Sequence, residues 1–379
     1  MTRVVIATRK WASWPDFGGA TWVPMQYLLG LMRLGVDVIW VDHLRRVDPI
    51  RDAHSLDYLI ERFGATARAF GFADRWSVVH DGSQHHFGIA GADVEAFAAE
   101  ADLLVGLSGK GLPEGSPLLR IPRRAYVDLD PGFTQIWAHV VDMRLAHYNI
   151  FFTVGLNVGT PDFPISTQGI RWHTMLPPVV LDLWPANIDP SCQRFSTIGD
   201  YWGKQYVKYN DQYYGSKREE FLRFVGVPSA AGQPVEAALT LSPTDHREVG
   251  LLTTNRWVLL DPYLYAGDPQ AYREFIRYSR AEFSVAKNGY VRSCSGWVSD
   301  RSACYLASGK PVLVQSTGIE PHLPTGMGLL TFRTPDEAVA GIRAINADYL
   351  AHARTARELA ERWFDSDRVL RGFLERALS

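Results

Sequence analysis

Apolar residues gather in short unbroken runs along the first half of the chain. The clearest runs are residues 3–8 (RVVIAT) and 36–41 (VDVIWV). A strand buried on both faces of a parallel sheet shows such a continuous run, whereas a strand with one wet face alternates apolar and polar residues. The same pattern predicts further strands at 77–79, 103–107, 124–128 and 150–154.

The residues between the first two runs have helical spacing, with apolar positions at Met25, Leu28, Leu29 and Met32. Pro24 falls in the first turn and Gly35 follows the end, as expected for a helix. A strand, a helix and a second strand in this order form a βαβ unit. Their alternation along the chain predicts an α/β fold with doubly wound sheets, in which ligands bind at the carboxyl ends of the strands.

Residues 177–193 interrupt this periodicity with four prolines and no clear period, which is typical of a linker between domains. Beyond them the pattern predicts strands at 194–199, 235–241 and 257–260, and helices at 217–225 and 268–283. An apolar strand from Gly289, a small-residue turn, a helix from Ser299 and another strand after Pro311 follow. At 379 residues the chain is long enough for two domains, each with its own core.

Composition narrows the function classes. Hydrophobic residues make up 46% and charged residues 21% of the chain, and the formal net charge is −2. Without a surplus of Lys and Arg, nucleic acid is not expected as a partner. No cationic segment precedes a long apolar stretch and no run approaches the ~20 residues of a membrane span, so we expect a cytoplasmic protein without a transmembrane segment.

The three cysteines are too widely spaced for a disulfide framework or a four-thiolate zinc site, at positions Cys192, Cys294 and Cys304. The histidines His85, His86, His173 and His322 lack the spacing of a helical metal site. No metal site is therefore predicted. Cys304 could act as a nucleophile, but a free cysteine on a helix facing a sheet more often behaves as a small hydrophobe.

The helix predicted from Ser299 begins directly behind a strand. Such a helix directs free backbone N–H groups and the positive end of its dipole at whatever lies above the strand ends, which favours phosphate. Ser299 and Ser302 could add hydroxyl groups and Arg301 a charge. Ser299 is equally suited to be a plain N-cap. Asp300 would repel a phosphate, so it faces a nucleoside or stabilises the helix.

Two motifs near the ends of the chain resemble bacterial glycosyltransferases of the two-domain GT-B type, in families similar to 1 and 4. The first is the small-residue turn, helix and Ala-x-Gly-x-Pro-Val pattern of residues 307–312. The second is the opening strand, the Gly18–Gly19 loop, the helix and the Gly-x-x-Val strand that starts at Gly35. Together they span most of the chain in the order of such enzymes.

The resemblance implies two Rossmann-like domains that face each other across a cleft. The acceptor domain would comprise residues 1–180, the linker 181–193 and the nucleotide-sugar domain 194–360. The final segment, 361–379, would be a C-terminal helix that packs back on the first domain; its stripe at Leu370, Phe373, Leu374 and Ala377 needs a partner surface.

The resemblance also implies an activity: transfer of a sugar from a UDP-, GDP- or TDP-sugar to a hydroxyl group, or other nucleophile, of a small-molecule, lipid or glycan acceptor, without metal or cofactor. Many inverting relatives use a His after the first strand, which this loop lacks. Many retaining relatives use two glutamates, and those positions hold Gly296 and Cys304. The stereochemical outcome is therefore open, and a nucleotide-sugar 2-epimerase or a non-catalytic two-domain ligand-binding protein remains an alternative.

Two aspartates are candidates for the catalytic base. Asp16 precedes the Gly18–Gly19 bend, where the backbone could approach a ligand or simply turn. Asp130 follows a predicted strand, together with Asp128, and could instead cap the turn that follows it. The pair could form a metal-binding Asp-x-Asp, but alternate strand residues and the GT-B pattern favour one aspartate in the cleft.

Two further side chains complete the predicted donor site. Lys287 is a charged group within the otherwise apolar segment that leads to Gly289, and Trp297 lies in the turn before the helix. An aromatic ring there could stack on a sugar or nucleobase, or pack in the core. The predicted donor-binding residues are Gly18, Gly19, Lys287, Trp297, Ser299, Asp300, Arg301 and Ser302.

Overall fold

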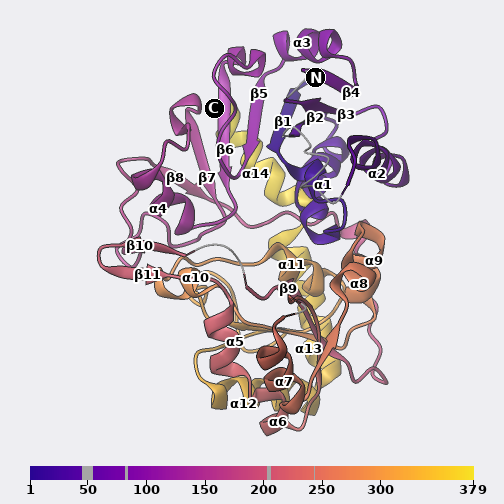
Figure 1. The fold of residues 1–379 in the computed structure, drawn as a ribbon, viewed down its shortest axis with the longest axis vertical. Helices are drawn as coiled ribbons and strands as arrows, with labels where there is room; N and C mark the ends of the chain where they lie inside the picture. Colours follow the sequence, from indigo (N-terminus) through magenta and orange to yellow (C-terminus); the bar gives the residue numbers. More distant parts are fainter. Residues whose placement is uncertain (45–53, 82–83, 203–205, 243) are drawn as a thin grey trace.

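A computed structural model describes residues 1–44, 54–81, 84–202, 206–242 and 244–379. Two separate, mainly parallel sheets dominate it, and helices cover both (Figure 1). We call residues 3–174 the first lobe and residues 195–347 the second lobe. The predicted boundaries between the domains remain a prediction.

The first lobe is built on an eight-stranded sheet with the order β4-β3-β2-β1-β5-β6-β7-β8. All neighbouring strands are parallel except the β3–β4 pair. The central strands carry the continuous apolar runs and are buried on both faces, as the pattern predicts. The strands are β1 (Arg3–Arg9), β2 (Asp37–Leu44), β3 (Trp76–His80), β4 (His85–Gly88), β5 (Leu103–Leu107), β6 (Arg123–Asp128), β7 (Ile150–Thr153) and β8 (Trp172–Thr174).

Helices and short turns connect these strands. They are η1 (Trp11–Ser13), α1 (Gly18–Arg33), α2 (Leu56–Ala69), α3 (Gly91–Ala99), η2 (Pro117–Arg120), α4 (Phe133–Val140), η3 (Leu145–His147) and, after the sheet, η4 (Leu181–Leu183). The helix predicted between the first two strands is α1, with Met25 and Leu28 fully buried. Register is set by burial: Val4 pairs with Val38 on one side and with Leu103 on the other.

The second lobe holds a six-stranded parallel sheet with the order β13-β12-β9-β14-β15-β16. Its strands are β9 (Phe195–Asp200), β12 (Val235–Thr240), β13 (Trp257–Leu260), β14 (Ala281–Ser284), β15 (Val312–Gln315) and β16 (Leu329–Phe332). A separate antiparallel hairpin consists of β10 (Val207–Tyr209) and β11 (Gln212–Tyr214). Figure 1 shows this hairpin beside α4 of the first lobe, and the two elements are in contact.

Helices flank the second sheet and continue to the end of the chain. They are α5 (Arg218–Phe224), α6 (Val227–Ala231), α7 (His246–Thr254), α8 (Pro262–Ala266), α9 (Pro269–Arg277), α10 (Asn288–Arg292), α11 (Asp300–Ala307), α12 (Pro335–Ala347), α13 (Tyr349–Leu359), η5 (Ala360–Phe364) and α14 (Ser366–Leu378). The last helix, α14, lies against α1 and β6 of the first lobe (Figure 1). The Phe373 ring packs on Phe152 at a centroid distance of 4.6 Å.

Two predicted elements are wrong. The helix predicted over 268–283 ends at Arg277, and Ala281–Ser284 is instead strand β14. The strand predicted from Gly289 is the short helix α10. The apolar run that forms β14 starts only a few residues after α9, so the helical spacing runs into the strand without a Gly or Pro to separate them.

Candidate active site

The start of α11 faces the carboxyl ends of β14 and β15. Ser299 is the N-cap, and its hydroxyl accepts a hydrogen bond from the Arg301 N–H at 3.2 Å. Ser299 and Ser302 border a cavity of about 20 Å³ whose wall also includes Ser284, Ala286, Trp297, Val298, Val314 and Gln315. The Ser302 hydroxyl is buried without a hydrogen-bond partner among the described residues. An unused buried donor at a helix N-terminus fits an anion.

Arg301 turns back into the second lobe. Its side chain is almost fully buried, and its Nε donates to the Glu282 carboxylate at 2.6 Å. One terminal nitrogen donates to the Ile198 carbonyl at 2.5 Å. The other donates to the Ser284 hydroxyl. The guanidinium therefore links α11 to β9 and β14. It also supplies the opposite charge that the fully buried Glu282 carboxylate needs.

The structure adds Lys217, which the sequence analysis did not select. This lysine is 9% exposed and is the N-cap residue of α5. Its Nζ lies close to Gly199, near the end of β9, and the Arg301 guanidinium lies close to the same glycine. Burial, together with the charges of Arg301 and Lys287, lowers the pKa of Lys217 to about 7. An anion at this place would restore its positive charge.

A cation at a helix N-cap is the signal that could have revealed this residue. The N-terminal end of a helix carries a positive partial charge, so a capping position normally holds Ser, Thr, Asp or Asn. The positive charge of Lys217 is unfavourable at that end of the helix. Two glutamates, which are favourable there, follow in the first turn of α5. The conflict between the lysine and its position indicates a role outside helix formation.

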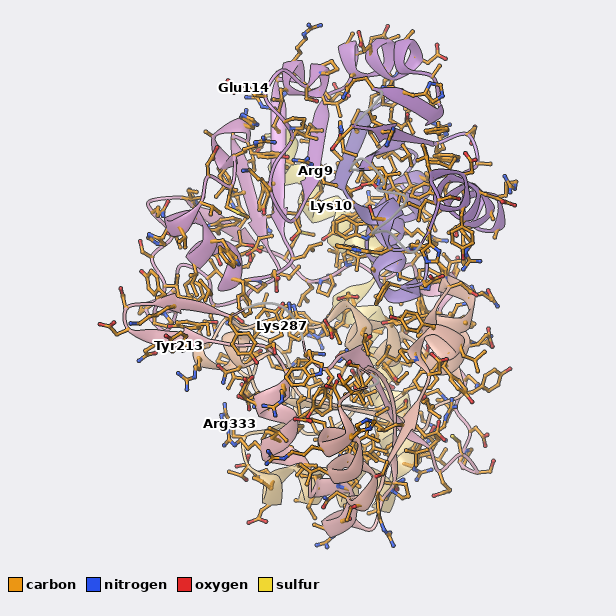
Figure 2. The ribbon with its side chains drawn as sticks, in the orientation of Figure 1. Arg9, Lys10, Glu114, Tyr213, Lys287 and Arg333 are labelled. Atoms are coloured by element: carbon orange, nitrogen blue, oxygen red, sulfur yellow. The ribbon has the colours of Figure 1, made fainter. Side chains whose placement is uncertain are left out.

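Asp130 joins the two lobes. Its carboxylate lies 2.8 Å from the Nζ of Lys287 and also accepts a hydrogen bond from the Tyr290 hydroxyl. Burial and the Asp130 charge raise the pKa of Tyr290, so its proton stays on the phenol. Figure 2 labels Lys287 at the side of the second lobe that faces the first (Figure 2). The predicted base candidate and a predicted donor contact thus meet.

Asp128, the neighbouring aspartate, has a different environment. It is fully buried and accepts hydrogen bonds from Thr134, Gln135 and Thr153 at 2.6 to 3.0 Å. It also accepts the backbone N–H of Asp130 at 2.9 Å, so Asp128 rather than Asp130 holds the turn. Burial raises the pKa of Asp128. This carboxylate organises the segment that presents Asp130.

Asp16 and the two glycines lie at another part of the boundary between the lobes. The Asp16 carboxylate is 2.7 Å from His54 Nε2, and the His54 ring stacks on Tyr58. A side chain at Gly18 would collide with the Asp268 carbonyl, and one at Gly19 with the Tyr272 ring. The glycines therefore allow α1 to approach α9 of the second lobe closely.

Trp297 and Asp300 complete the predicted set. The Trp297 ring lies 4.4 Å from that of Tyr290, and its backbone forms a bridge with Gly155 of the first lobe. Loss of hydration raises the pKa of Asp300, although the Arg301 charge opposes this shift. Trp297 thus packs beside the Asp130–Lys287–Tyr290 group, whereas Asp300 lies in the first turn of α11.

The described residues contain no group of three or more His, Cys, Asp or Glu side chains arranged to hold a metal ion. None of the helices in this part of the chain is long and apolar enough to cross a membrane. The predicted cytoplasmic location remains a prediction.

No family model matches the sequence, and no curated protein matches it either. Solved structures nevertheless match the fold over the whole chain. An alpha-glucosyltransferase in complex with UDP matches with a TM-score of 0.63 at 11% identity, covering 100% of both chains. Sucrose-phosphate synthase from Thermosynechococcus elongatus gives 0.57 at 11% identity, covering 100% of this chain and 99% of that chain. Anabaena HepE, in complex with UDP and glucose, gives 0.56 at 12% identity, covering 99% of each.

These proteins have the GT-B fold of glycosyltransferases, and the predicted α/β fold with parallel sheets, consistent with GT-B, is confirmed. The two-domain arrangement across a cleft stays a prediction. At identities of 11 to 12% the likeness concerns the fold alone. The roles of individual residues must therefore come from the geometry of this chain.

Proposed function

We propose that this chain, which has the GT-B fold, is a glycosyltransferase that moves a sugar from a nucleoside-diphosphate sugar to an acceptor hydroxyl. One observation carries the proposal: the N-terminal end of α11 lies at the strand ends of the second lobe, with the unpaired Ser302 hydroxyl in the wall of the cavity there. The buried Lys217 lies near Gly199, where the Arg301 side chain of the same helix also lies. A leaving diphosphate needs these three features, namely N–H donors, a hydroxyl and a cation in a place shielded from water.

UDP is the first nucleotide to test. The alpha-glucosyltransferase and HepE structures were both solved with it. The cavity at α11, about 20 Å³, has room for about one water molecule and is too small for a nucleotide. Binding therefore requires the side chains around it, or the two lobes, to move apart, and closure afterwards would exclude water.

Asp130 is the proposed base. The acceptor oxygen attacks the anomeric carbon and forms the new C–O bond while the bond from that carbon to the diphosphate oxygen breaks. The diphosphate leaves with the bonding electron pair, and Asp130 takes the proton of the acceptor hydroxyl. The Lys287 ammonium group, 2.8 Å away, holds the carboxylate in place until substrate enters. The charge on the leaving group is met by Lys217 and α11, so the proposed reaction uses no metal or cofactor.

The Asp16–His54 pair is a second candidate base, because a carboxylate that contacts one imidazole nitrogen orients the ring for proton transfer. Aspartate-to-asparagine variants separate the two. Whichever substitution abolishes transfer while nucleotide affinity persists marks the base.

The proposal is tested by titrating UDP, GDP and TDP into the protein by calorimetry, and by screening nucleotide sugars for slow release of nucleotide. We expect one nucleotide to bind and the corresponding nucleotide sugar to be hydrolysed slowly. Lys217→Met should weaken binding, whereas Lys208→Met, on the exposed β10–β11 hairpin, should not. No binding of any of the three would refute the donor site. Conversion of the donor to a 2-epimer without an acceptor would indicate the epimerase instead.

A further inference from the structure

The strand ends of the first lobe carry a group of cations that the donor site does not use. We define the basic edge as Arg9, Lys10 and Arg144, which come from the end of β1 and from the segment after α4. In a parallel sheet the carboxyl ends of the strands are where ligands bind. Figure 2 shows Arg9 and Lys10 in the first lobe, with Lys287 of the second lobe below them.

Two guanidinium groups converge at the basic edge. Arg9 and Arg144 each direct a terminal nitrogen at the Gly111 carbonyl, at 3.5 and 3.3 Å. Like charges that share one neutral acceptor repel each other, and the repulsion is stronger where water is partly excluded. The Arg9 side chain is 26% exposed, so it is largely shielded from water. An anion between the two groups would relieve this repulsion.

Protein groups leave part of this charge unsatisfied. The Arg9 Nε is buried without a hydrogen-bond partner among the described residues, and so is the Nε2 of His43 at the end of β2. His43 is 9% exposed. Asp81 is the carboxylate beside both, and it is 3.6 Å from Arg9 and from His43. At that distance it contributes attraction but not a good hydrogen bond.

The other charged groups nearby do not cancel the basic edge. The ammonium group of Lys10 is exposed and makes no hydrogen bond or ion pair in the part of the chain that the structure describes. Lys110, in the loop after β5, adds another exposed cation. Glu114 of the same loop is well separated from Arg9 and Lys10 in Figure 2. Three edge cations therefore stand against two carboxylates, Asp81 beside Arg9 and the exposed Asp142, which accepts a hydrogen bond from the Arg144 backbone N–H at 2.7 Å.

We infer that the basic edge binds an anionic group, phosphate or carboxylate, of the acceptor. This inference rests on the proposed glycosyl transfer, in which the first lobe binds the acceptor and the second the donor. Paired guanidinium groups suit such oxyanions because their N–H donors match two oxygens at once. The edge is small and the chain has a net charge of −2, so a single charged group fits better than a nucleic acid.

The test is a calorimetric titration of inorganic phosphate, glucose 6-phosphate and glucuronate, with uncharged glucose as the paired neutral compound. Saturating UDP is present so that the donor site is occupied. We expect at least one of the three anions to bind and glucose not to bind. Arg9→Gln and Arg144→Gln should each weaken anion binding about tenfold, because each removes one charge-assisted hydrogen bond. Lys10→Gln, at an exposed position, should weaken it less.

Arg123→Gln is the matched control, since Arg123 is exposed at the opposite, amino-terminal edge of the same sheet. It should bind anions like the unaltered protein. No heat with any anion, equal binding of glucose, or binding insensitive to the Arg9 and Arg144 variants would overturn the inference.

Two further titrations identify the source of the anion. Vesicles of phosphatidylinositol and of phosphatidylcholine separate a lipid headgroup from a soluble metabolite. A duplex DNA that binds more tightly than every small anion would overturn the inference in favour of a nucleic-acid acceptor. The outcome for the donor is read separately: anion binding lost in Arg9→Gln but kept in Lys217→Met supports the basic edge even where UDP fails to bind.

Discussion

The carboxyl edges of the two sheets both carry cations but differ in how far those cations are buried. In the second lobe the edge is buried: Arg301 is bonded to a fully buried Glu282, and Lys217 lies beside them with its pKa lowered to about 7. In the first lobe Lys10 is exposed, Arg144 is half-buried, and Arg9, at the end of β1, is 26% exposed. A buried, fixed arrangement suits one constant ligand such as a diphosphate, and open side chains suit a partner that differs between enzymes.

The difference has an energetic cost that falls on the second lobe. Buried charges that are not fully paired lower stability, and they persist in a protein when they are needed for a ligand. The cations of the first lobe cost less, because water reaches Lys10 fully and Arg9 and Arg144 in part. Substitutions at the carboxyl edge of the second lobe should therefore change both stability and binding. Substitutions at the basic edge should change mainly binding.

The largest expected effect is on stability in the second lobe. Arg301→Met leaves the Glu282 carboxylate buried and unpaired, so we expect a loss of about 3–5 kcal/mol in the free energy of unfolding, measured by denaturant titration. The double variant with Glu282→Met should recover most of this loss. Lys208→Met, which breaks the exposed pair with Asp211, should change stability by less than about 1 kcal/mol. An Arg301→Met protein as stable as the parent would show that the edge is not a strained, buried arrangement.

The next effect is on turnover at the junction of the lobes. Asp130→Asn removes the proposed proton acceptor but keeps the shape of the side chain, so transfer should fall about 10²–10⁴-fold. Nucleotide affinity, set in the second lobe, should change little. Asp93→Asn, at an exposed position of α3 in the first lobe, is the control and should keep full activity. If turnover in Asp130→Asn stays within twofold of the parent while Asp16→Asn is inactive, the base is the Asp16–His54 pair.

A smaller effect concerns the pH dependence of nucleotide binding. The free protein loses the Lys217 proton as pH rises through about 7, and a bound diphosphate favours the charged form and raises that pKa. Binding therefore takes up a proton, and UDP affinity should fall as pH rises from 7 to 9, by up to about tenfold per unit. Lys217→Met should bind UDP about tenfold more weakly at pH 6.5 and lose this slope. An identical slope in both proteins would exclude Lys217 from the site.

The contrast between the edges also explains what the sequence could predict. The strands β1 and β2 were predicted well because continuous apolar runs are strong local signals. The short strands β4, β8, β10 and β11 were not, since three or four residues carry little pattern. The N-cap at Ser299 was predicted from its position before a helix.

Contacts between distant segments left no local trace in the sequence. Asp130 and Lys287 are 157 positions apart, and neither reveals its partner by composition or spacing. The burial of Lys217 depends on β9 and α11 packing around it. The convergence of Arg9 and Arg144 on Gly111 likewise needs three loops in place. Local physics thus predicts elements and caps, and tertiary packing decides which charged groups meet.

The central claim is that the first turn of α11 binds the diphosphate of the donor. Hydrogen exchange of the backbone amides with and without UDP tests it most directly, because a bound phosphate protects the N–H groups that it accepts from. We predict that UDP slows exchange in the peptide covering Ser299 to Ala303 and in the peptide containing Lys217, with little change at the β10–β11 hairpin. UDP that binds but leaves exchange at α11 unchanged would contradict the account.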